Sequence, residues 1–210
     1  MLTLSFLILY ACGDGLELRE ETDALGFRTE FRVDPETKLK EGPLRQYDPK
    51  GRLTMEEHYL EGKLDGVRKI YTPEGVLIVE ENYKADAFEG DYITYDSTGV
   101  ISGKGQYSDG AMNRAWYLFY PNGNVKEVVT FVDNNENGPF REWYENGKPK
   151  ASGEYLDGDQ EHGVLHLYAE NGELERVMNC DLGLCMTFWT PDSTGAAPAG
   201  ADMTMPEIAR

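Results

Sequence analysis

Hydrophobic and polar positions along the chain recur with a period of 24 residues, extended once by a single added residue near Gln160. One aromatic series occupies Tyr47, Tyr71, Tyr95, Phe119, Trp143 and Tyr168. A second series runs twelve residues behind it, through Tyr59, Tyr83, Tyr107, Phe131, Tyr155 and finally Cys180. Two glycine series, Gly42 to Gly163 and Gly51 to Gly172, keep the same spacing, with Arg114 at one place of the first. Four series that agree over six periods predict stacked structural repeats.

Each period has the pattern of a two-stranded hairpin. In residues 42–65, two runs of strand length flank Asp48-Pro49-Lys50-Gly51, where proline favours the first corner of a turn and glycine tolerates a positive φ. A second, looser turn follows at residues 61–66. The predicted fold is therefore all-β: an elongated, single-layer antiparallel meander of about six two-stranded repeats.

Side-chain alternation divides the strands into two faces. Tyr47 is expected opposite Leu53, and Leu53 shares its face with Tyr59, six residues later. This counting predicts that both aromatic series form ladders on one face, which we expect to be the core. The opposite face, with Glu56 and His58, is expected to be solvated.

Three large residues interrupt the polar face in the middle repeats. Counting places Tyr92, Trp116 and Phe140 on that side, in consecutive units. Aromatic residues on a polar face are candidates for gripping sugar rings or a partner's apolar side chain, so these three form the candidate binding surface. The alternative is that a chain terminus covers them.

The pattern G-x4-Y-x3-G-x-L-x5-Y resembles the variant form of the membrane occupation and recognition nexus (MORN) repeat, from Gly42 to about Cys180. The resemblance implies a twisted single-layer sheet with a binding or scaffolding role. Some bacterial members of that family are described as antitoxins, which suggests a soluble antitoxin-like protein as an alternative function.

The first eleven residues, MLTLSFLILYA, carry no charge and end in a small residue, as an export signal does. Residues Leu9 to Cys12 resemble the lipobox of bacterial lipoproteins, which implies that Cys12 is acylated with palmitate-like chains that anchor the protein. Residues 12–41, charged and irregular, are then expected to be a tether and cap before the repeat domain at 42–185. The alternative is a buried N-terminal strand in a cytoplasmic protein.

The two C-terminal cysteines span a predicted turn. Cys180 and Cys185 are expected to face each other across a hairpin at disulfide distance, with reduced thiols as the alternative. With Cys12 lipidated, the remaining cysteine count is even, as an exported protein prefers. Residues 186–210 are expected to be a strand end and a flexible tail, because Pro, Ala and Gly dominate its last twenty residues.

Composition narrows the function. The chain has 38 acidic and 20 basic residues, a net charge of -18 that disfavours nucleic acids and anionic lipids as partners. Asp133 to Gly138 reads like the opening of a calcium-binding loop, but Tyr144 stands where the bidentate glutamate belongs, so we expect a turn without metal. His58, His162 and His166 lack zinc-ligand spacing. We expect no cofactor.

These observations favour a non-enzymatic, lipid-anchored protein of the bacterial cell envelope, in the outer membrane. Its repeat sheet is expected to present a surface to another protein or to a surface glycan. Glycan hydrolysis would require a carboxylate pair in a cleft, which a single-layer meander does not offer.

Overall fold

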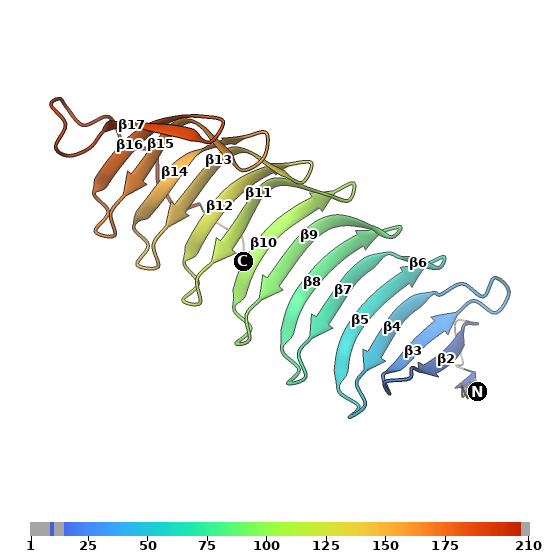
Figure 1. The fold of residues 1–210 in the computed structure, drawn as a ribbon. Helices are drawn as coiled ribbons and strands as arrows, with labels where there is room; N and C mark the ends of the chain where they lie inside the picture. The colour runs from blue at the N-terminus through green and yellow to red at the C-terminus, as the bar shows by residue number, and fades with distance from the viewer. Residues whose placement is uncertain (1–8, 11–14, 207–210) are drawn as a thin grey trace. The chain divides into compact units, whose positions relative to one another are not determined.

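The computed structural model describes residues 9–10 and 15–206, and within these ranges the regular structure consists of strands (Figure 1). Cys12 lies outside the described residues. No helix long and apolar enough to cross a membrane occurs in the described part of the chain. The predicted all-β antiparallel meander is confirmed, with strands following one another in space in chain order.

The chain divides into two compact units, the first ending at Val100 with residues 107–110 added, and the second holding residues 101–106 and those from Ala111 onward. Strand β10 (Ile101–Ser108) is shared between them. Unit 1 contains β1 (Leu9–Tyr10), β2 (Glu17–Thr22), β3 (Arg28–Val33), β4 (Gly42–Tyr47), β5 (Leu53–Leu60), β6 (Lys63–Leu64), β7 (Gly66–Tyr71), β8 (Leu77–Lys84) and β9 (Ala87–Tyr95). Unit 2 contains β11 (Ala111–Phe119), β12 (Val125–Val132), β13 (Asn135–Trp143), β14 (Pro149–Leu156), β15 (Gln160–Tyr168), β16 (Leu174–Asp181) and β17 (Leu184–Trp189).

The segment before the first repeat is more regular than expected. Strands β2 and β3 form an antiparallel hairpin, and β3 pairs in turn with β4. Phe31 and Val33 in β3 are buried beside Leu44 in β4. The expectation of an irregular tether was wrong for residues 17–33, because alternation of apolar and charged residues gives β3 a buried face.

Both turn series have the backbone that their sequences favour. The tight turn after β4 closes with Gly51, at φ 79°, whose amide donates to Asp48 O at 2.8 Å. Most of the looser turns are two-residue hairpin turns with positive φ at both central residues, as at Asp133 (49°) and Asn134 (68°). The turn between β14 and β15 has three residues, 157–159, at the place of the added residue. The calcium-like segment is therefore a turn followed by strand β13.

The predicted assignment of faces was wrong at one point in five of the six repeats. Gln46 pairs with Met55, but Tyr47 pairs with Leu53, so Thr54 is an extra residue in β5. Equivalent register shifts precede the first-series aromatic residue in later repeats (Tyr71, Phe119, Trp143 and Tyr168). A bulge reverses the alternation, so the two aromatic series lie on opposite faces of the sheet.

The second aromatic series belongs to the core. In unit 1, Tyr59 and Met55 pack against the buried Phe31, Val33 and Leu44. In unit 2 the buried cluster comprises Val129, Phe140, Ala151, Leu165 and Cys180. Each unit thus keeps one apolar face along its strands.

The opposite face of unit 1 carries charge. Arg45 Nε donates to Glu56 at 2.9 Å, and Lys69 lies 3.5 Å from Glu80 in the next hairpin. Tyr71 of the first series donates its hydroxyl to Glu56 at 2.9 Å. Burial, and then this carboxylate, raise the pKa of Tyr71 to about 12. The alternating charges form a cross-strand ladder.

Candidate binding surface

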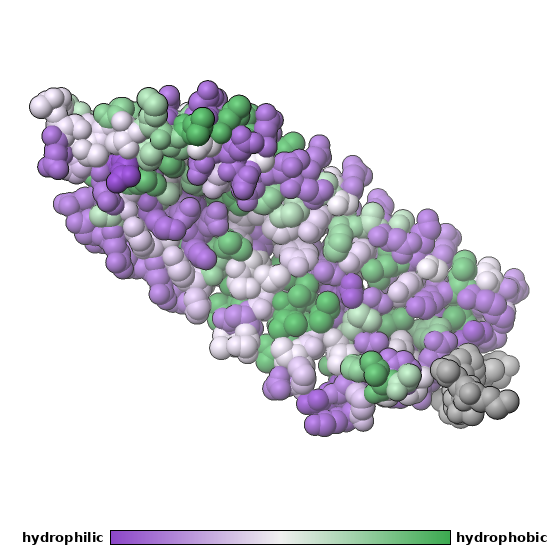
Figure 2. Space-filling model, in the orientation of Figure 1, coloured by the Kyte–Doolittle hydropathy of each residue, from purple (hydrophilic) through white to green (hydrophobic). Residues whose placement is uncertain are grey.

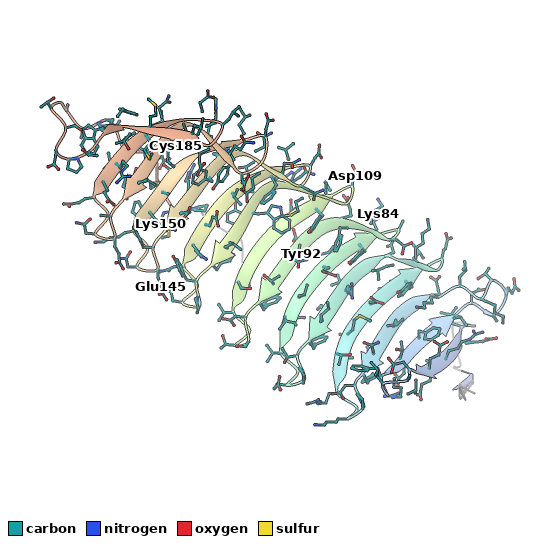
Figure 3. All side chains as sticks on the ribbon, viewed as in Figure 1. Lys84, Tyr92, Asp109, Glu145, Lys150 and Cys185 are labelled. Carbon is teal, nitrogen blue, oxygen red and sulfur yellow. A yellow bond between two sulfur atoms is a disulfide. The ribbon has the colours of Figure 1, made fainter. Side chains whose placement is uncertain are left out.

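The three predicted surface aromatics are packed residues. Phe140 is 3% exposed and stacks on Tyr155 with ring centroids 4.3 Å apart. Trp116 packs against the same cluster. In unit 1, Tyr92 on β9 lies 5.7 Å from the ring of Tyr107 (Figure 3). The prediction of an exposed binding surface at these three residues was wrong, because the bulge puts them on the same face as the second aromatic series.

Two strand glycines make room for these rings. A Cβ on Gly153 would come within 2.9 Å of Phe140, and a Cβ on Gly105 within 2.1 Å of Trp116. Each ring therefore lies directly over backbone that has no side chain. Glycine inside a strand marks such a close approach, and this was the available sequence signal for the packing of Trp116 and Phe140.

The C-terminal segment lies against the side of β13–β15 that carries the first aromatic series. Trp143 Nε1 donates to Met203 O at 3.1 Å, and the amide of Ala201 donates to the Tyr168 hydroxyl at 2.9 Å. Both rings are almost fully buried. The expectation that this tail does not pack was wrong, because Trp143 and Tyr168 each pair a large apolar ring with a polar atom.

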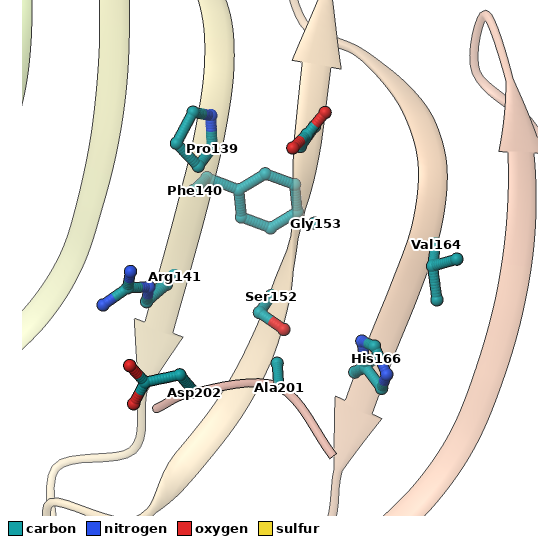
Figure 4. Close-up of a pocket in the computed structure, with 10 residues that line it drawn as sticks. Pro139, Phe140, Arg141, Ser152, Gly153, Val164, His166, Ala201 and Asp202 are labelled. Atoms are coloured by element: carbon teal, nitrogen blue, oxygen red, sulfur yellow. The ribbon is translucent and has the colours of Figure 1, made fainter. Parts of the chain in front are cut away.

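A groove of about 420 Å³ remains between this segment and the sheet (Figure 4). We call it the tail groove; its lining residues are Pro139, Phe140, Arg141, Ser152, Gly153, Glu154, Val164, His166, Ala201 and Asp202. Ser152 is 6% exposed, and its Oγ has no hydrogen-bond partner within the described ranges. The groove therefore contains a polar atom that its own chain leaves unpaired.

The tail groove holds the residue types of a hydrolytic triad without the arrangement. Ser152 and His166 are direct cross-strand neighbours, and Asp202 lies across the groove. However, His166 Nε2 lies 3.2 Å from Ala199 O, while the Asp202 carboxylate accepts from Thr204. Hydrogen bonds from Thr204, and then the charge of Arg141, hold the pKa of Asp202 below its usual value. His166 and Asp202 therefore contact residues of the C-terminal segment rather than each other, and Ser152 Oγ has no partner within the described ranges.

A second group of ionisable side chains, in unit 1, is joined by ion pairs and hydrogen bonds. On the apolar face of unit 1, Arg68 lies 3.3 Å from Glu57 and 3.5 Å from Glu81. Tyr59 and Tyr83 donate their hydroxyls to these two carboxylates. No group of three metal-ligating side chains was found among residues 9–10 and 15–206.

At the last hairpin, Cys180 and Cys185 are joined by a disulfide, with their Cα atoms 4.0 Å apart. Cys180 also occupies the end of the second aromatic series, where it is 2% exposed. Beside it, β17 exposes Leu184 (80%) and Met186 (75%), at the end of unit 2 where Figure 2 shows hydrophobic residues at the surface.

With this geometry in place, comparison with known families gives one result. Three segments match the MORN repeat variant. They cover residues 64–85, 115–133 and 136–157, each of which spans most of one hairpin and ends at the first residue of the looser turn that follows it. No curated protein matches the chain. The matches, together with the aromatic and glycine series, indicate a repeat scaffold.

Proposed function

We propose that this protein is a non-enzymatic scaffold of the bacterial envelope that is anchored by lipid at Cys12 and binds another protein through unit 2. The observation that carries the binding role is the C-terminal segment, which lies across three strands and is held by Trp143, Tyr168 and His166. A sheet that holds an irregular segment in this way has the chemistry needed to hold a partner's chain. A glycan ligand has less support, because it depended on the candidate binding surface being exposed, and those three aromatic residues are packed.

The location rests on the sequence and on the cysteine pair. The uncharged run before Cys12 has the form of an export signal, and the Cys180–Cys185 disulfide is typical of an oxidising compartment. The cytoplasmic antitoxin-like alternative would instead keep these thiols reduced.

Palmitate labelling and fractionation of cells test the anchor. The wild-type chain is expected in the membrane fraction with label, and Cys12→Ser is expected to be unlabelled and soluble. Cys185→Ser, which changes a different cysteine, serves as the control and should keep both label and membrane location. Equal membrane association of Cys12→Ser and wild type would refute the lipid anchor.

A further inference from the structure

The side of β13–β15 that carries the first aromatic series binds the C-terminal segment through main-chain atoms of the segment, and the tail groove is the space that remains beside it. The three contacts involve Met203 O, Ala201 N and Ala199 O, and each is made by a side chain of the sheet. Main-chain recognition of this kind depends on an accessible backbone and little on the identity of the bound side chains. The contacts therefore suit an extended peptide of suitable shape, whichever protein supplies it.

One glycine of the segment limits the size of the residue that can bind at Tyr168. A Cβ on Gly200 would lie 3.3 Å from the Tyr168 hydroxyl, closer than ordinary contact. Gly200 also sits between two alanines, so the segment has only small side chains where it crosses Tyr168. A ligand for this position is restricted to small residues, because the hydroxyl must reach the backbone amide.

The segment uses only part of the site. Ser152 lines the groove, but its Oγ is buried and unpaired while the segment is bound, and an unsatisfied buried hydroxyl is costly. A ligand that supplies a polar atom there gains a hydrogen bond that the C-terminal segment does not make. The charge of Arg141 favours an acidic residue at the position that Asp202 occupies.

We propose that the side of β13–β15 held by the C-terminal segment, together with the adjoining tail groove, is a recognition site for an extended, small-residue peptide of the partner protein, and that residues 199–205 are its built-in competitor. This inference deepens the proposed function, since it names the kind of partner and its control. The partner's peptide binds only the fraction of molecules whose own segment has left, which lowers its apparent affinity by that fraction.

The test uses the full chain with a protease site inserted between Gly195 and Ala196. A fluorescent peptide of residues 196–206 is added before cleavage, and again after cleavage and removal of the released segment by dialysis. We expect at least tenfold tighter binding to the cleaved chain. In the cleaved chain, Trp143→Phe removes the donor to Met203 O and should weaken binding about three- to tenfold. A peptide carrying Gly200→Leu is the matched control and should bind poorly to both forms.

Equal binding before and after cleavage, or tight binding of the Gly200→Leu peptide, would overturn the proposal. Absence of peptide binding to the cleaved chain would do the same, provided that its circular dichroism matches that of the uncut chain. Fractionation of Cys12→Ser is independent of this groove, so failure of the anchor and failure of the peptide site are distinguishable.

Discussion

Arg114 occupies a position that the other repeats reserve for glycine. It has φ 65°, and the equivalent glycines (Gly42, Gly66, Gly90, Gly138 and Gly163) have φ between 72° and 114°. The repeat geometry imposes this positive φ whatever residue is present, so Arg114 holds a backbone conformation unfavourable for a residue with a Cβ. Replacing it by glycine is therefore expected to stabilise the protein.

The expected gain follows from two opposing effects. A left-handed conformation costs about 1–2 kcal/mol in a residue with a Cβ. Against this gain, glycine lowers the free energy of unfolding by about 0.5–1 kcal/mol, because an unfolded chain with glycine has more conformational freedom to lose on folding. The Arg114 side chain contributes little, since its contact with Gln106 is exposed and 3.4 Å long. Arg114→Gly should raise the free energy of unfolding by about 0.5–1 kcal/mol.

Urea titration followed by circular dichroism measures this difference, and the melting temperature should rise by about 1–4 °C. Gly138→Ala is the matched opposite change one repeat later. It should cost about 1–3 kcal/mol, because φ is 114° and its Cβ would lie 3.4 Å from Thr130. A lower stability of Arg114→Gly, or an unchanged stability of Gly138→Ala, would show that the repeat does not impose the backbone as argued.

Two further substitutions test the core of unit 2. Phe140→Ala should lower the free energy of unfolding by about 3–5 kcal/mol in urea titration, against less than about 1 kcal/mol for Leu118→Ala, whose side chain is 43% exposed. A similar small loss for both would contradict the assignment of Phe140 to the core. Burial, and then the charge of Glu142, raise the pKa of Glu127. The ionised carboxylate therefore destabilises the folded state at neutral pH, and this destabilisation is lost as the pH falls through the raised pKa and Glu127 becomes protonated. Glu127→Gln should therefore raise the urea midpoint at pH 7 and change it little near pH 4, and an equal gain at both pH values would argue against titration as the cause.

Much of the fold could be predicted because the repeated residues meet conformational requirements of the turns and strands in which they lie. Glycine at Gly51 and its equivalents is required by the backbone of the turn, and hairpins follow from turns spaced by strand lengths. The disulfide partners were also predictable, since two cysteines flanking a short turn have one obvious arrangement. The candidate site was predicted poorly, because burial of Phe140 depends on the faces of the strands.

The sequence by itself determined the period and the positions of the turns, since these depend on residues close in the chain. Only the tertiary structure decided which face each series occupies, because the extra residue at Thr54 and its equivalents becomes visible only when two strands are paired. It also decided the place of the C-terminal segment. Its composition predicts no regular structure, but residues 33 to 60 positions earlier, such as Trp143 and Tyr168, supply the donors and acceptors that hold it. Long-range packing of this kind leaves no local pattern in the sequence.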